Sequence, residues 1–238
     1  MASIAAQRAI GALGAFFHAT KPVSWRDAFI GAFAWPAFWC LAAVDGLFLA
    51  VHVLHMLEVQ AFLGEAFNIQ TDGGHSEVFQ HLKELLIALA LASLAWQKRG
   101  VVHAYWAVVF AYLLADDRFM IHETMGPLVS AALGLERYLQ YPYDVGQVLY
   151  SAAVVSVIIL AFVLLLARTA ASLRPFSLGL LGLVLVLGFF GVAVDLLHVM
   201  ASNVGIRGLG LLEDGGEMFV MSAMVAYVLR HALAVGRS

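Results

Sequence analysis

The stretch of residues 148–167, VLYSAAVVSVIILAFVLLLA, contains no charged side chain. A helix of about 20 mostly apolar residues crosses roughly 30 Å of hydrocarbon, so such a stretch is typical of a membrane span that faces lipid or packs against other spans. The composition extends this interpretation to the whole chain, because 63% of the residues are hydrophobic and only 12% are charged. Soluble globular domains carry about twice that share of charged residues. The sequence therefore predicts an integral membrane protein.

Six stretches are long and apolar enough to span, and they predict an all-α integral membrane protein built as a six-transmembrane-helix bundle. They cover residues 28–57, 77–96, 101–121, 145–167, 176–201 and 212–234. No polar stretch is long enough to build a soluble domain, so residues 26–238 are expected to form one membrane domain. Residues 1–25 carry apolar side chains near helical spacing, and we expect them to form a short N-terminal interfacial amphipathic helix.

The lysines and arginines predict how these spans are oriented. With the N-terminus inside, nine of the 13 positive charges fall on the cytoplasmic side, as the positive-inside rule requires. These nine are Arg8, Lys21, Arg26, Lys98, Arg99, Arg168, Arg174, Arg230 and Arg237. We therefore expect a multi-pass protein of a cell (inner) membrane with both termini in the cytoplasm. His18, His103 and His231 are then expected at the cytoplasmic interface.

Acidic residues and histidines gather at the opposite, outer ends of five predicted spans. They are Asp45, His52 and His55; Glu77, His81 and Glu84; Asp116, Asp117, His122 and Glu123; Asp195 and His198; and Glu213, Asp214 and Glu217. A charge at the bilayer centre costs about 2.5 to 3.5 kcal/mol, so such groups normally face the bundle interior. The sequence therefore predicts a polar chamber in the outer leaflet, open to the exterior or periplasm.

We expect this chamber to hold a divalent transition metal, Zn or Fe, as one ion or two. The acids greatly outnumber the nearby cations Lys83 and Arg118, and such an excess requires protonation or a bound cation at low dielectric. Pairs of ligands three residues apart build di-iron and di-manganese sites in helical bundles, and mixed imidazole and carboxylate ligation suits Zn and Fe. The predicted ligands are His81, Glu84, Asp117, Asp195, His198 and Glu217, with His52, His55 and His122 as further ligands or as partners that orient them.

The leading hypothesis is a metal-dependent membrane enzyme acting on a lipid or quinone-like small molecule. If the ion is zinc, a bound water can attack an ester or amide of a lipid, with a spare carboxylate, Glu123 or Glu213, as the catalytic base. If the site holds a pair of irons, it can oxidise a lipid or quinone-like substrate. The sequence does not choose between a zinc hydrolase and a di-iron oxidoreductase.

Three other classes of function stay open. Haem electron transfer would use His52 or His55 with His122, and His81 with His198, as axial pairs, although haem does not call for so many carboxylates. Proton or cation transport would use the acidic chamber, but few polar groups continue the path inward. The third class is a subunit of a larger membrane complex, in which the polar end is a docking surface. Oligomerisation is equally open.

Simpler interpretations exist for each part of the chamber. Glu77, Glu123 and Glu213 can lie in water at helix ends, and Asp195 with His198 can be a buried hydrogen-bonded pair. The sequence excludes other chemistries more firmly. A net charge of -3 without a basic stripe argues against nucleic acid as a partner, and the single Cys40 leaves no disulfide or CxxC pair.

Overall fold

The computed structural model describes residues 30–97, 99–202 and 208–236, and all regular structure in these ranges is helical. Five helical segments within them are long and apolar enough to cross a membrane. They are α3 (Pro36–Met56), α4 (His75–Trp96), α7 (Pro142–Leu166), the continuous segment Arg174–Ala201, and Leu209–Val235 of α10 (Leu209–Gly236). The prediction of an all-helical, multi-pass membrane protein is confirmed at this level. The amphipathic helix predicted for residues 1–25 lies outside the described residues.

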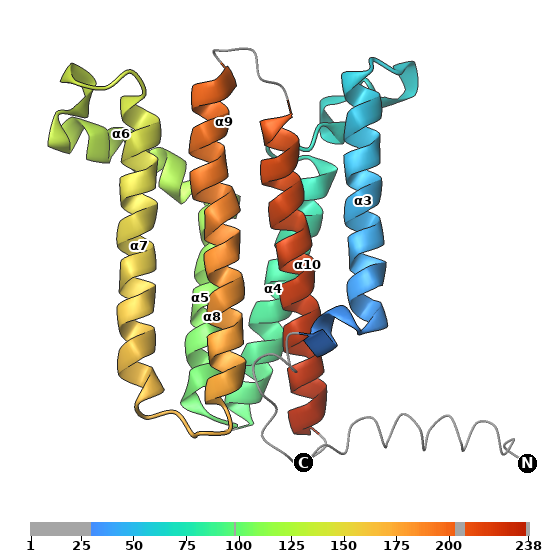
Figure 1. Cartoon of the computed structure of the whole chain (residues 1–238), viewed down its shortest axis with the longest axis vertical. Coiled ribbons are helices and arrows are strands. Elements are labelled where there is room, and N and C mark those ends of the chain that lie inside the picture. Colours follow the sequence, from blue (N-terminus) through green and yellow to red (C-terminus); the bar gives the residue numbers. More distant parts are fainter. Residues whose placement is uncertain (1–29, 98, 203–207, 237–238) are drawn as a thin grey trace, which may run out of the picture.

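A further long helix, α5 (Val101–Phe119), runs beside α4 inside the bundle (Figure 1). Its last turn carries Asp116, Asp117 and Arg118, and these charges keep it from qualifying as a span by composition. The sequence predicts six spans, whereas five helical segments of the described residues qualify by length and composition. The chain then turns sharply at Met120, whose φ of 50° is left-handed, and continues as α6 (Ile121–Leu133).

The segment Arg174–Ala201 contains an irregular turn in its middle. It begins as α8 (Arg174–Gly188), widens into a π-helix at η4 (Phe189–Val194), and continues as α9 (Asp195–Ser202). π-helical turns are rare and occur frequently at functional sites, because the wider turn displaces side chains from the regular helical positions. The predicted fifth span, residues 176–201, therefore contains a distortion that its apolar pattern does not reveal.

Prolines explain where several helices begin. Pro36 and Pro142 each occupy the first turn of a helix, where a missing N–H removes no intrahelical hydrogen bond. The first predicted span, residues 28–57, is divided for this reason. Residues 30–33 are helical, residues 34–35 form a turn, and α3 starts anew at Pro36.

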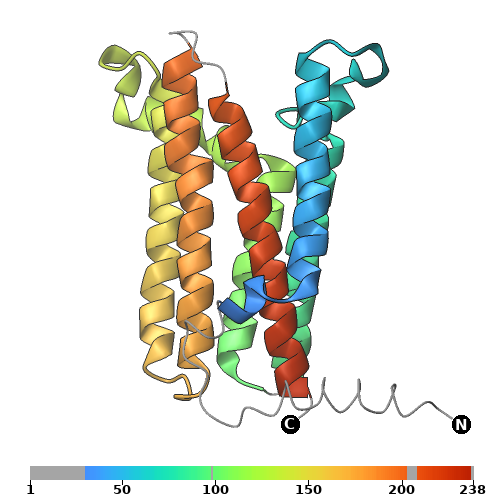
Figure 2. The same cartoon turned by 45° about the vertical axis from the view of Figure 1, so that its right-hand side comes forward.

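Helix α10 occupies the centre of the bundle and packs against α3, α4, α8 and η4 (Figures 1 and 2). Fully buried apolar side chains surround its inner half. They include Ile87, Leu91, Trp106, Phe110, Leu180, Met221 and Met224. Among the described residues, these side chains fill the inner half of the bundle, away from the end where α9 and α10 meet.

The two ends of the bundle differ in charge. Arg99, Arg168 and Arg174 lie at the connections between α4 and α5 and between α7 and α8, and Arg230 lies near the C-terminal end of α10. All four are therefore at one end of the bundle, the lower end in Figure 1. The acidic residues of α9 and of the start of α10 are at the other end.

Candidate metal centre

Three side chains from two helices converge at the acidic end of the bundle. His81 and Glu84 lie one turn apart on α4, and Asp117 lies in the last turn of α5. One ligand atom from each residue lies within 4.8 Å of the corresponding atoms of the other two. The convergence follows from the fold, because α4 and α5 are antiparallel neighbours joined by a short connection, so the beginning of α4 lies level with the end of α5.

Two atoms of this group are buried without a hydrogen bond. Glu84 is 1% exposed, and within the described residues its Oε2 has no hydrogen-bond partner. His81 Nε2 is also buried and lies 3.3 Å from Glu77 Oε1 without hydrogen-bond geometry. Buried polar atoms are nearly always hydrogen-bonded or bound to an ion. The chemistry and burial of these donors fit a metal ion.

Glu217 of α10 approaches the same group from the facing helix. Its charge interacts with those of Glu84 and Asp117, so its carboxyl lies near both. The side chain also lies against Gly191 in η4, where a Cβ atom would overlap Glu217 Oε1. The π-helical turn and the glycine together leave room for this acid in the interior.

These residues adjoin a cavity of about 540 Å³ at the acidic end of the bundle. Ten of the acidic residues and histidines of the predicted polar chamber line it: Glu77, Glu84, Asp117, His122, Glu123, Asp195, His198, Glu213, Asp214 and Glu217. None of the described residues that line the cavity is Lys or Arg. The structure thus brings six of the nine predicted ligands to one cavity. His81, a seventh, lies beside Glu84 and Asp117.

Two of the cavity histidines are held by carboxylates. His198 Nδ1 lies 2.8 Å from Glu213 Oε2, and His122 Nδ1 lies 3.1 Å from Asp116 Oδ2. Such a bond fixes the ring and its tautomer, and it leaves Nε2 for other interactions, as in most metal-binding histidines. For His122 the hydrogen bond to Asp116 raises the pKa of the imidazole, which favours its protonated form. The protonated ring can donate a proton, whereas metal binding would require the neutral ring.

Asp195 and Glu213 form a second acidic group on the facing wall. The two carboxyls are within hydrogen-bonding reach of each other, and Asp214 is close enough to interact with both. Together with His198 they place a second set of oxygen and nitrogen donors on α9 and α10. These donors could hold a second metal ion, as a dinuclear site would require.

The structure places His52 and His55 outside the cavity. Ile69 N donates a hydrogen bond of 3.3 Å to His52 Nδ1, and His55 Nδ1 lies 2.8 Å from the carbonyl oxygen of Phe62. Both rings therefore tie the segment between α3 and α4 to the end of α3. His52 and His55 were predicted as ligands because they share one helical face with Asp45. The same spacing is equally compatible with these packing contacts.

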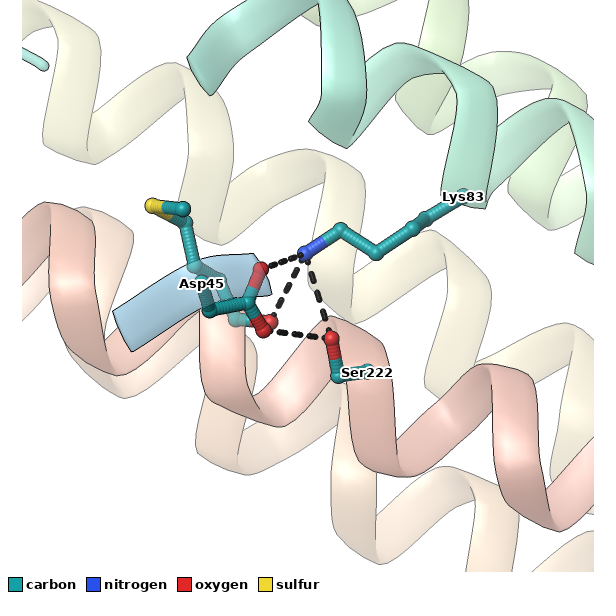
Figure 3. A network of polar contacts seen from close by, with 4 residues as sticks. Asp45, Lys83 and Ser222 are labelled. Atoms are coloured by element: carbon teal, nitrogen blue, oxygen red, sulfur yellow. Dashed lines mark hydrogen bonds and ion pairs between the residues drawn. The ribbon is translucent and has the colours of Figure 1, made fainter. Parts of the chain in front are cut away.

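A buried ion pair between Lys83 and Asp45 (Figure 3) adjoins the cavity at Met218, one of the residues that line it. Lys83 Nζ is 3.0 Å from Asp45 Oδ1, 2.9 Å from the carbonyl oxygen of Met218 and 3.4 Å from Ser222 Oγ. Ser222 Oγ in turn donates a 2.5 Å hydrogen bond to Asp45 Oδ2. This network was not predicted from the sequence, although a lone acid in one span and a lone lysine in the next are a usable signal for such a pair.

His103 and His231, both expected at the cytoplasmic interface, pair with each other. His103 is completely buried at the arginine-rich end of the bundle, and its Nε2 lies 2.9 Å from His231 Nε2. The ring of Phe176 stacks on His231 at 3.7 Å between centroids. His18 lies outside the described residues.

Comparison with known proteins connects this architecture to a family. A family model described as a domain of unknown function (DUF8692) matches residues 28–231, a range that includes every described residue lining the cavity. Comparisons with curated proteins and with solved structures found no match. The family match covers most of the chain, and the protein therefore belongs to the DUF8692 family.

Proposed function

We propose that the protein is a metal-dependent integral membrane enzyme acting on a lipid or another small molecule dissolved in the membrane. The observation that carries this proposal is the convergence of His81, Glu84 and Asp117 on one point, with Glu84 buried and the other two half-buried. One imidazole and two carboxylates suit zinc or iron, and three protein ligands leave a coordination position for water or substrate. Glu217 supplies a further oxygen from the facing helix.

The charge balance of the cavity supports a bound cation. Carboxylates crowd its wall, and the nearest buried cation, Lys83, is already paired with Asp45. Like charges this close repel strongly at low dielectric, whereas a divalent ion between them offsets the repulsion. A metal therefore explains why the acids remain together.

The surrounding residues provide a proton acceptor for metal-assisted hydrolysis. His81, Glu84 and Asp117 would hold the zinc, and a water bound there would have a pKa lowered toward neutrality and could act as a nucleophile. Of the two predicted catalytic acids, Glu213 holds His198, and Glu123 is exposed where it lines the cavity. We assign the base to the His198 and Glu213 pair, with Glu123 as a shuttle to solvent. Oxidation by a di-iron site is the alternative chemistry.

We also propose that α5 is the sixth membrane helix and that the cavity opens to the exterior or periplasm. The close packing of α5 on α4 along its length supports the first point. The second rests on Arg99, Arg168, Arg174 and Arg230 at the opposite end, which the positive-inside rule assigns to the cytoplasm. Cysteine accessibility in intact cells, probed at both ends of the bundle, tests the orientation.

Elemental analysis of the purified, folded protein tests the metal. We expect about one or two equivalents of zinc or iron in the wild type, and a large loss in Glu84→Gln and Asp117→Asn. Glu136→Gln changes an exposed acid in the short helix η3 (Leu135–Arg137), outside the cavity, and should retain the metal. Folded wild-type protein that binds no transition metal, even after incubation with zinc or ferrous iron, would refute the proposal.

Proton or cation transport is the rival function that the geometry supports next. The Asp45, Lys83 and Ser222 network adjoins the acidic cavity, as a relay would require. Further inward, however, Leu91, Trp106 and Met224 are fully buried and apolar packing resumes. Ion or proton flux in liposomes that is abolished by Asp195→Asn would favour transport over catalysis.

A further inference from the structure

The cavity has two chemically different parts. Its outer part is lined by carboxylates and histidines, whereas its inner part continues between α5, α7 and α8 along apolar side chains. These are Leu113, Val154, Val155, Ile158, Val184 and Leu187. Leu113 lies one turn inward of Asp117 on α5, so the apolar part begins where the candidate metal centre ends. We call this inner part the apolar arm.

The cavity as a whole, with its polar mouth and apolar arm, is long enough for an extended amphiphile. Gln147 and Ile158 both line the cavity from α7, and at 1.5 Å per residue they are about 16 Å apart along the helix axis. The apolar arm takes up the inner part of this length, about 6 Å from Val154 to Ile158. The cavity volume of about 540 Å³ falls within the range typical of small-molecule sites. A polar mouth joined to an apolar arm matches the shape of an amphiphile.

The arm lies next to the helix that faces lipid. Val157, Leu160 and Val163 on the outer side of α7 are 57% to 67% exposed. Helix α7 packs mainly against α6 and much less against α5 and α9, the helices that share the cavity with it (Figure 1). A ligand dissolved in the bilayer therefore needs to pass only this lightly packed boundary to reach the arm.

We propose that the apolar arm binds the alkyl chain of a single-chain amphiphile whose head is uncharged or cationic and lies among the carboxylates. The sign of the head follows from the lining, because acidic side chains without Lys or Arg repel an anion. The position of the head at a metal rests on the proposed function. The position of the chain rests on the apolar lining alone.

Photolabelling in lipid nanodiscs tests the chain site. The probe is a long-chain alcohol with a diazirine near the end of its chain, and labelled residues are mapped by mass spectrometry. We expect labels on the arm, for example at Val154 or Ile158, and competition by a long-chain alkylamine but not by an alkyl sulfate. Val154→Trp fills the arm and should reduce this labelling several-fold. Val157→Trp places the same bulk on the lipid-facing side of α7 and should leave it unchanged.

Two results would overturn the inference. One is labelling confined to the outer face of α7, such as Val157 and Leu160, in the wild type, a result that depends on no variant. The other is arm labelling that Val154→Trp leaves intact in protein that still elutes as a folded species. Repeating the experiment with Glu84→Gln separates this inference from the proposed function. If the arm is still labelled in this variant when no metal is bound, the alkyl-chain site stands without the metal centre. If the wild type binds metal but its arm is not labelled, the alkyl-chain site is refuted and the metal centre is not.

Discussion

Glu217 on α10 lies against the bare backbone of Gly191 in the π-helical turn, so closely that a Cβ atom at position 191 would overlap its Oε1. The π-helix and the glycine act together here. The wider turn displaces the backbone of the Arg174–Ala201 segment, and the missing side chain leaves space for a carboxylate facing Glu84 and Asp117. The π-helical turn, which interrupts the regular helical hydrogen bonding, therefore lies where Glu217 needs space.

Gly191→Ala should displace Glu217 and lower metal affinity on the order of 10-fold, the lower end of the effect seen when a partner of a metal ligand is disturbed. Metal affinity measured by competition with a chelator checks this. Gly188→Ala is the matched control, because Gly188 also lines the cavity but a Cβ atom there has nothing within 4 Å. Equal affinity in the two variants would show that Glu217 does not take part in metal binding.

Lys83→Met should be strongly destabilising because it leaves Asp45 buried without its counter-ion. Removal of one partner of a buried ion pair costs about 3 to 5 kcal/mol in soluble proteins, and Asp45 and Lys83 are 0% and 2% exposed. Unfolding in a detergent titration measures the change. The double variant Asp45→Leu with Lys83→Met removes both charges and should recover much of the loss. A double variant as unstable as the single one would show that packing, and not charge pairing, dominates at this position.

The helical class and the depth of the polar groups could be predicted from the sequence, because both depend on local composition. Runs of apolar residues identify helices in a membrane, and residues at one helix end share one level whatever the tertiary packing. That level alone places Glu84, Asp117 and Glu217 at a similar depth in the bundle. Which acids face each other at that level depends on helix rotation, which hydropathy does not encode.

The features that sequence reasoning missed all depend on tertiary contacts. Met120 is not glycine, yet it adopts a left-handed conformation that divides α5 from α6, and no local signal marks it. The π-helix at Phe189–Val194 cannot be recognised from the sequence either, because its residues are apolar like the rest of the span. The contact between His103 and His231 has no local signal either, because the two residues lie on helices far apart in the sequence.

Removal of the metal should lower thermal stability, since a ligand that binds only the folded state stabilises it. At a free metal concentration of 100 times the dissociation constant the gain is about 2.7 kcal/mol. Thermal unfolding with a chelator, and again after zinc or iron is restored, measures the shift. Asp117→Asn should show a much smaller response to added metal, whereas Glu136→Gln should respond like the wild type. A chelator response of equal size in Asp117→Asn would place the stabilising ion elsewhere.

Asp116→Asn should lower the pKa of His122. The hydrogen bond from the ring to Asp116 raises the pKa of His122 above its ordinary value of 6.5, and the charge of Asp116 acts in the same direction. The asparagine retains an oxygen that can accept the 3.0 Å hydrogen bond from the backbone N–H of His122, so the start of α6 is preserved while the negative charge is lost. The pH titration of isotopically labelled histidine followed by NMR measures the pKa directly.

The same hydrogen bond sets a pH window for the stability of the turn between α5 and α6. Because the folded pKa of His122 is raised, its contribution to stability is fully present below pH 6.5, and it is lost as the pH rises through the folded pKa. The wild type should therefore exceed Asp116→Asn in stability most clearly under mildly acidic conditions, and the difference should shrink toward alkaline pH. A difference that grows with pH would mean that His122 is neutral in the folded protein, as a metal ligand would be, and would restore it to the list of candidate ligands.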